Sequence, residues 1–241
     1  MSAHNQDGPD ETHAWLEAAE LSAGAAYRLM TDIIAPRPIA WVSTVDGDGR
    51  RNLAPFSYYQ AVCSSPPTIV LGIGWPASGR PKDTLANILS QREFTVCHVD
   101  RASADAMQQT SANVGPEVDE WTMPGVGDVV TPVPSRHVAP PRIAEAHAAL
   151  ECRLVHAIPL GEGPTGQPSS TLVIAQVVCF VVRRSLLTQD AQGRQVPIDP
   201  GHLRSVARMG GIAYTTTHER FELPRAKTGG AQTLGPRLTD K

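Results

Sequence analysis

The stretch PRPIAWVSTVDGDGRRNLAPFSYY, residues 36–59, decides the fold. An apolar run at residues 39–43 leads into an Asp-Gly-Asp-Gly turn at residues 46–49. An Asp-Gly pair between two short runs predicts a β-hairpin. The returning strand ends in a proline-containing segment at residues 52–57, where a scaffold tends to present binding groups. We expect this hairpin and its exit to form one wall of a cofactor site.

The opposite wall is expected from residues 80–87, which begin a short amphipathic helix. Asp83 or Thr84 is a suitable N-cap for this helix. Its free backbone N–H groups, together with the charges of Lys82 and Arg80, favour an anion. The hydroxyls of Ser43 and Thr44 are expected to donate to the same anion. The alternatives are an ordinary capped surface helix and, at residues 52–57, a simple turn.

Composition narrows the class of protein. The formal net charge is -3, and aromatic residues make up 5% of the chain, so neither a basic surface nor an extended base-stacking surface for nucleic acid is expected. The 20 glycines and 21 prolines favour many short elements joined by turns. The polar N-terminus is unlike a secretory signal, and the longest apolar run, at residues 172–182, is too short to span a bilayer. We expect no membrane association and a cytoplasmic location.

The order of elements predicts an α+β protein, mainly β, built on an antiparallel barrel or sandwich. Residues 1–24 form an N-terminal extension, partly disordered; residues 25–224 form one domain; and residues 225–241 form a flexible tail. Residues 114–142 are irregular and proline-rich, as in a covering segment or a partner-binding arm. Beyond the hairpin, strands are expected at 58–63, 68–73, 93–99, 148–159 and 171–184. Helices are expected at 13–21, 25–32, 82–89, 103–112 and 198–208.

No side chain is expected to be catalytic, and no metal site is expected. Sequence signatures of nucleophilic serine, zinc-binding histidine, dinucleotide and P-loop sites are missing. Four cysteines lie far apart without a CxxC pair, and are expected to be reduced and mostly buried: Cys63, Cys97, Cys152 and Cys179.

The string PRPIAWVST…GxxNLAPFSYYQAVCSSPPTIVLGI…KDTLANI…EFTVCHV, with ALEC at 149–152 and RMGGIAY at 208–214, resembles the flavin reductase-like family. The resemblance covers residues 27–223. It implies the FMN-binding split barrel, a six-stranded antiparallel Greek-key barrel with flanking helices. It also implies a homodimer with flavin near the subunit interface.

The resemblance assigns residues to the flavin. Ser43, Thr44, Lys82, Asp83 and Thr84 match positions near the phosphate and ribityl chain. The segment lining the isoalloxazine ring is matched by Asn52, Ala54, Pro55, Phe56 and Ser57. Trp41 lies on the same hairpin, close to the ring or in the core. Arg208 and Tyr214 close the pocket from the C-terminal side.

The implied activity is reduction of FMN, or of FAD, by NADH or NADPH, with onward transfer to a monooxygenase or an electron-transfer protein. The flavin carries the chemistry. Many relatives have a Gly-Asp-His before the last long strand, whereas this chain has Gln-Pro-Ser-Ser-Thr at 167–171. That difference favours the flavoredoxin-like or ferric reductase-like branch. Two alternatives stay open: an FMN-binding electron carrier reduced by a partner protein, and a binding module that has lost the cofactor.

Overall fold

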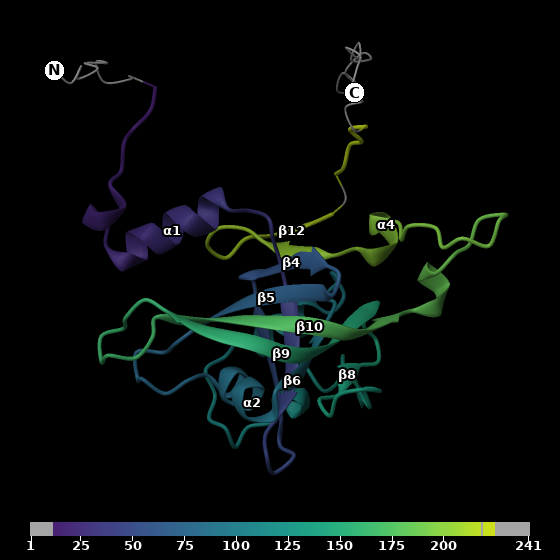
Figure 1. Ribbon diagram of the computed structural model, residues 1–241, viewed down its shortest axis with the longest axis horizontal. Helices are drawn as coiled ribbons and strands as arrows, with labels where there is room; N and C mark the ends of the chain where they lie inside the picture. The colour runs from purple at the N-terminus through teal and green to yellow at the C-terminus, as the bar shows by residue number, and fades with distance from the viewer. Residues whose placement is uncertain (1–11, 218, 225–241) are drawn as a thin grey trace.

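The structure, a computed structural model, describes residues 12–217 and 219–224 (Figure 1). The disorder expected within residues 1–11 and the flexible tail expected at residues 225–241 lie outside the described residues. Residues 114–142 lie within them and can be followed throughout.

Seven antiparallel strands form the main sheet. They are β2 (Ala40–Val45), β3 (Arg51–Phe56), β4 (Tyr59–Ser64), β5 (Pro67–Gly74), β6 (Glu93–Cys97), β9 (Ala148–Leu160) and β10 (Ser170–Val182). Their order in the sheet is β3-β2-β6-β9-β10-β5-β4. The expected mainly-β architecture with few helices is confirmed, and the main sheet has seven strands where six were expected.

The two edges of this sheet are joined directly. Strands β3 and β4 are consecutive in the chain yet occupy opposite edges, and only Ser57 and Tyr58 separate them. Three residue steps from Phe56 to Tyr59 span at most about 11 Å. The sheet therefore has to curl until its edges approach each other, and the exit of β3 lies at the resulting split.

Smaller elements complete the fold. A three-stranded sheet has the order β1 (Arg37–Pro38), β11 (Val206–Arg208) and β12 (Tyr214–Thr216), and β7 (Pro132–Val133) pairs with β8 (Arg142–Ile143). The helices are α1 (Ala23–Ile33), α2 (Asp83–Gln91), α3 (Ala104–Gln109) and α4 (Pro200–Leu203). Short 3-10 turns lie at Ala18–Glu20, Glu120–Thr122 and Arg184–Leu186. Within the described part of the chain, none of these helices has the length and apolar character that crossing a bilayer demands.

Two helix predictions were wrong. The helix expected at 198–208 ends after one turn, because Arg204 adopts a left-handed backbone with φ of 52°. The following residues pair with β1 as strand β11, a long-range contact that local sequence does not encode. The helix expected at 13–21 is reduced to the 3-10 turn at Ala18–Glu20.

Two apolar clusters stabilise the barrel. One fills its interior and includes Phe94 of β6 together with Leu85 and Ile88 of α2, which closes one end. The other lies on the outer face of β2 and β6, where Trp41 packs in the same cluster as Trp121. The irregular residues 114–142 thus supply a covering layer for the sheet, as one of the two expectations proposed.

His98, a half-buried residue that follows β6, makes stability depend on pH. Its Nε2 lies 2.8 Å from the Ser205 hydroxyl, and its ring centroid lies 5.8 Å from that of His147. Asp100 lies beside His147, with 3.8 Å between carboxylate oxygen and Nδ1. Burial, helped by His147 and opposed by Asp100, lowers the pKa of His98 to about 4. Protonation of His98 is therefore disfavoured in the folded state.

We expect the free energy of unfolding to decrease as the pH falls, because the unfolded chain protonates His98 more readily than the folded chain does. The unfolded chain binds the proton at a pKa near 6.5, whereas folded His98 takes it only near 4. The stabilisation is complete above pH 6.5 and is lost between 6.5 and 4, by roughly 2–3 kcal/mol. Urea unfolding across this pH range measures it. His98→Gln is expected to flatten the profile and the exposed His156→Gln to leave it unchanged; an unchanged slope in His98→Gln contradicts the assignment.

Candidate functional site

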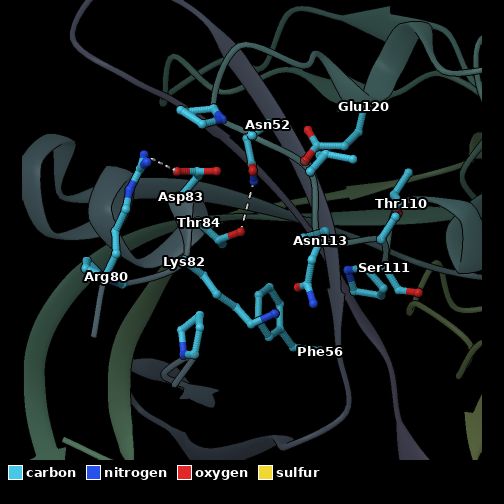
Figure 2. A pocket seen from close by; sticks show the side chains of 18 of the residues that line it. Asn52, Phe56, Arg80, Lys82, Asp83, Thr84, Thr110, Ser111, Asn113 and Glu120 are labelled. Carbon is cyan, nitrogen blue, oxygen red and sulfur yellow. Dashed lines mark hydrogen bonds and ion pairs between the residues drawn. The ribbon is translucent and has the colours of Figure 1, made fainter. Parts of the chain in front are cut away.

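A cavity of about 490 Å³ lies between the edge strand β3 and the N-terminus of α2 (Figure 2). Three stretches line it: β3 with its exit, residues 76–84, and residues 110–116, with Glu120 added from the covering segment. This volume falls within the roughly 300–1,000 Å³ of ordinary small-molecule sites. The lining is mostly polar, as suits a ligand that carries charge.

The structure brings together the two walls expected from sequence. The Asn52 side-chain Nδ2 donates to Thr84 Oγ1 at 2.9 Å, and both side chains are buried (Figure 2). This bond ties the middle of β3 to the first turn of α2. In this bond the Thr84 oxygen is the acceptor, so the Thr84 hydroxyl proton remains available to donate to another partner.

The N-terminus of α2 faces this cavity without a side-chain cap. Helical geometry begins at Asp83, and the N-cap is Lys82, whose side chain makes no capping hydrogen bond. The expectation that Asp83 or Thr84 would be the cap was wrong, because both lie inside the first turn. An uncapped first turn presents backbone N–H groups and the positive end of the helix dipole to an anion.

Charges around this helix end leave one cation without a partner. Arg80 pairs with Asp83 at 3.1 Å. For Lys82 the described residues provide neither an ion pair nor a hydrogen bond, although it lines the cavity. Its ammonium group is therefore available to a ligand, and it adds to the field of the helix dipole.

Glu120 approaches the cavity from the covering segment. Its Oε2 accepts a hydrogen bond from the backbone N–H of Leu53 at 3.1 Å, and its side chain is buried. Burial raises the pKa of Glu120, the backbone N–H groups oppose the change, and Asp119 and Asp83 add to it. Because the Leu53 N–H points to Glu120 and not to β2, the unpaired edge of β3 lies on the cavity side.

Trp41 lies behind the wall and not in it. It is fully buried in the outer cluster, and its Nε1 donates to Thr110 Oγ1 at 2.9 Å. Thr110 lines the cavity and in turn donates to the carbonyl of Met107 at 2.8 Å. Of the two places expected for Trp41, the structure shows the core.

Ser43 and Thr44 do not line the cavity, and the expectation that both hydroxyls serve one anion is not met. Neighbouring residues of a strand face opposite sides of the sheet. The Thr44 hydroxyl accepts from Asn87 Nδ2 at 3.0 Å, and both side chains are buried. The Ser43 hydroxyl is buried without a hydrogen-bond partner among the described residues.

Arg208 and Tyr214 lie beside a smaller hollow of about 80 Å³ next to the main cavity. Pro55 and Phe56 line both spaces, and Ser57 lines the smaller one. The Arg208 guanidinium lies 4.8 Å from the centroid of the Tyr214 ring. These two residues therefore line the smaller hollow and not the main cavity, and Pro55 and Phe56 lie between the two spaces.

Several lining residues escaped the sequence reasoning. They come from the irregular segment and its approach: Thr110, Ser111, Asn113 and Glu120. Only the length of that segment indicated a covering role, because no local motif marks which of its side chains turn inward. Ala54 completes the β3 wall as expected.

The sequence matches a family model. Residues 33–198 match the flavin reductase like domain. An uncharacterized protein of Halalkalibacterium halodurans is 37% identical over 210 residues, which cover 87% of this chain and 95% of the relative. The uncharacterized protein YwrF of Bacillus subtilis is 34% identical over 209 residues, covering 87% and 97%.

Solved structures share the fold over most of the chain. Nitrilotriacetate monooxygenase component B from Bacillus cereus has a TM-score of 0.78 at 34% identity, covering 88% of this chain and 98% of that one. The 2-nitrobenzoate 2-nitroreductase NbaA of Pseudomonas fluorescens has a TM-score of 0.73 at 26% identity, covering 90% and 99%. Flavoredoxin of Desulfovibrio vulgaris has a TM-score of 0.61 at 24% identity, covering 80% and 92%, a likeness of fold alone.

Proposed function

Because this chain belongs to the flavin reductase-like family, with its split-barrel fold, we propose that it binds FMN in the main cavity and reduces it with NADH or NADPH. The observation that carries the proposal is the uncapped N-terminus of α2 with the unpartnered Lys82 beside it, facing a cavity of suitable size. A phosphate is the group that this donor set fits, and FMN carries one.

Different residues contact the phosphate and the isoalloxazine ring of FMN. Lys82, Thr84 and the first-turn N–H groups of α2 hold the phosphate, whereas the charge of Arg80 is paired with Asp83. The isoalloxazine ring lies along the unpaired edge of β3 and its exit, between Ala54 and Ser57. The main cavity favours FMN over FAD, since one phosphate would already occupy the only α-helix N-terminus among its described lining residues.

The bound flavin supplies the redox chemistry by accepting hydride at N5 from reduced nicotinamide. The chain itself orients, desolvates and stabilises charge. Glu120 fixes the backbone of β3 through the Leu53 N–H, and so holds the edge on which the ring lies. No side chain has to exchange a proton with substrate.

A homodimer fits the surface of α1. Exposed apolar side chains gather there, with Tyr27 57% and Ile33 77% exposed, and Met30 and Ile34 half exposed or more. Patches of this kind on a soluble protein mark association surfaces. α1 ends at Ile33, and shortly after it the buried Arg37 of β1 donates through Nη2 to the Met209 carbonyl at 3.0 Å. The proposed interface therefore adjoins the loop between β11 and β12, whose flanking residues are Arg208 and Tyr214.

A second candidate is an FMN-binding electron carrier reduced by a partner protein. It is favoured by the lining of the cavity, which contains no histidine among the described residues. Residues 167–171, which lack the histidine common in relatives, lie against the neighbouring loop: Trp75 Nε1 donates to Thr171 Oγ1 at 2.9 Å. For both the reductase and the electron carrier, the proposed recipient of the electrons is a monooxygenase or an electron-transfer protein.

A visible spectrum of the purified protein tests the proposal. We expect flavin absorption to be present or to be retained after adding FMN and removing excess. Anaerobic NADH or NADPH is then expected to bleach it, because hydride reduces the bound flavin. Dithionite bleaches the same sample and serves as the control for a reducible flavin.

The outcomes separate the candidates. Bleaching by dithionite but by neither pyridine nucleotide overturns the reductase and supports the electron carrier. Protein that neither carries nor retains FMN overturns both and supports a binding module without the cofactor.

A further inference from the structure

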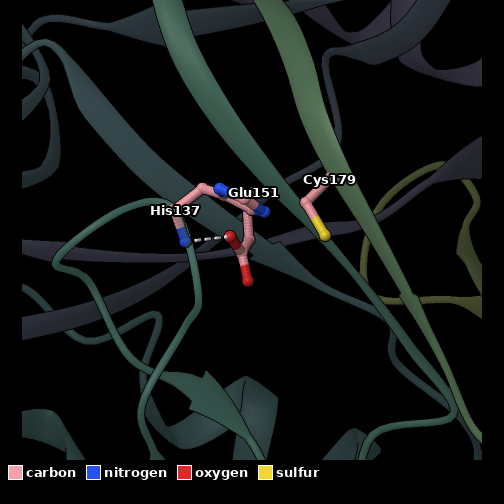
Figure 3. A group of neighbouring side chains, drawn as sticks. All are labelled: His137, Glu151 and Cys179. Atoms are coloured by element: carbon pink, nitrogen blue, oxygen red, sulfur yellow. Dashed lines mark hydrogen bonds between the residues drawn. The ribbon is translucent and has the colours of Figure 1, made fainter.

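Three side chains with metal-binding atoms lie close together where residues of β9 and β10 meet the connection between β7 and β8 (Figure 3). They are His137, Glu151 and Cys179, and one ligand atom from each lies within 4.8 Å of the other two. None of the three lines the main cavity. The proposed flavin site therefore does not explain why these three side chains lie close together.

A bulge in β10 directs Cys179 toward Glu151. Val177 is registered with Cys152 of β9, whereas Cys179, two residues on, is registered with Glu151. Cys152 and Glu151 are neighbours on β9 and so face opposite sides of the sheet. The register shift between Val177 and Cys179 thus moves the thiol out of the barrel interior and places it opposite the carboxylate.

Glu151 is a buried carboxylate without a cationic side chain. Its side chain is 1% exposed, and its two oxygens accept from the backbone N–H groups of Arg136 at 2.8 Å and His137 at 2.7 Å. No ion pair to it exists among the described residues. Each oxygen keeps a lone pair, and a buried carboxylate is stabilised by a pairing charge or a metal ion.

The other two donors are also uncommitted. The Cys179 thiol makes only a long 3.8 Å contact to the Phe180 carbonyl. The His137 ring is exposed and has no hydrogen-bond partner among the described residues. A thiol, an imidazole and a buried carboxylate therefore face one point, each with a free lone pair.

We propose that His137, Glu151 and Cys179 bind a divalent transition-metal ion of the zinc class. Thiolate, imidazole and carboxylate are the ligands of Zn²⁺, whereas Mg²⁺ and Ca²⁺ select oxygen ligands. Three protein ligands leave a fourth tetrahedral position to water. Binding displaces the thiol proton of Cys179 to solvent, and the ion supplies the charge that Glu151 lacks.

The required movement is small. Ligand distances of about 2.0–2.3 Å place tetrahedral donors roughly 3.3–3.8 Å from one another. The exposed His137 ring can close the remaining distance by rotating about its side-chain bonds, while Glu151 stays fixed by its two backbone donors.

The ion would fasten the covering segment to the sheet. His137 lies in the connection between β7 and β8, and its two ligand partners lie on β9 and β10. This connection otherwise contacts the sheet through polar bonds such as Thr95 Oγ1 to the Pro140 carbonyl at 3.0 Å. The ion would thus join the covering segment to the sheet, and this inference does not rest on the proposed flavin chemistry.

The test uses the untagged full chain with its flavin, stripped with EDTA and titrated with ZnCl₂ against a chromophoric chelator. We expect one zinc per chain, measured also by mass spectrometry of metal content, and a higher melting temperature with zinc. Cys179→Ser and His137→Gln are each expected to weaken zinc binding by more than the roughly 10- to 100-fold cost of losing an outer-shell partner. Both changes lie on side chains that are not fully buried, and circular dichroism verifies folding.

Cys63→Ser is the matched control, because Cys63 is also a free cysteine and is exposed on β4. It is expected to bind zinc like the wild type. Absence of stoichiometric uptake by the wild-type chain overturns the proposal, as does equal zinc affinity in folded Cys179→Ser. Equal loss in Cys63→Ser also overturns it, since that result assigns binding to thiols in general.

Discussion

Lys82→Met weakens FMN binding by roughly 10- to 100-fold and leaves riboflavin binding unchanged, if the ammonium group holds the phosphate. A hydrogen bond to a charged group contributes about 1.5–3 kcal/mol, and each 1.4 kcal/mol is tenfold in affinity. Methionine keeps most of the length and the apolar character of the side-chain stem and removes the ammonium group. Titrating apoprotein and following quenching of flavin fluorescence gives both dissociation constants.

Arg80→Met is the matched control. It also removes a positive charge close to the start of α2, but that charge is paired with Asp83 and its side chain is 62% exposed. We expect a change of less than about threefold in FMN affinity, because an exposed paired charge contributes little. Equal weakening of FMN and riboflavin in Lys82→Met contradicts the phosphate assignment.

Thr84 is a less selective probe than Lys82. Its hydroxyl accepts the buried Asn52 donor, so Thr84→Ala also leaves an amide unsatisfied between β3 and α2. A loss of affinity for both flavins in that variant is compatible with distortion of the wall. Lys82→Met is the better test, because Lys82 has no partner among the described residues and its loss removes a charge without breaking a bond within the wall.

Trp41→Ala is expected to lower the free energy of unfolding by about 3–5 kcal/mol, because it empties a fully buried site in the outer cluster. It also removes the Trp41 Nε1 group that donates a hydrogen bond to Thr110, a residue of the cavity wall. We therefore expect weaker binding of FMN and riboflavin alike. Urea unfolding of the apoprotein measures the stability without a contribution from ligand.

Trp15→Ala is the comparison for this change, since Trp15 is 75% exposed. Its effect on the free energy of unfolding is expected to stay within about 0.5 kcal/mol. A loss of less than 1 kcal/mol in Trp41→Ala contradicts the packing that we describe for the outer cluster.

The sequence predicted the parts of the site that local patterns encode. The Asp-Gly turn indicated the hairpin of β2 and β3, and the apolar spacing of Leu85, Ile88 and Leu89 indicated α2. Both elements exist within a few residues of the expected bounds. Their meeting across the cavity was inferred correctly, because polar groups at both ends suited one ligand.

Features that depend on distant pairing could not be predicted. Residues 206–208 continue an amphipathic pattern, yet pairing with β1 makes them a strand. The direction of Cys179 depends on a bulge against β9, which reverses the alternation that sequence reading assumes. For the same reason, spacing along the chain gave no sign that His137, Glu151 and Cys179 meet.

The two-residue link between β3 and β4 couples ligand binding to global stability. Its neighbours Pro55 and Phe56 line the cavity, and the link also holds the two sheet edges together. A ligand in the cavity binds the folded barrel and not the unfolded chain. At a free concentration 100 times its dissociation constant, such a ligand adds about 2.7 kcal/mol to the free energy of unfolding. With FMN as the proposed ligand, the supply of FMN in the cell is expected to affect how long the folded chain persists.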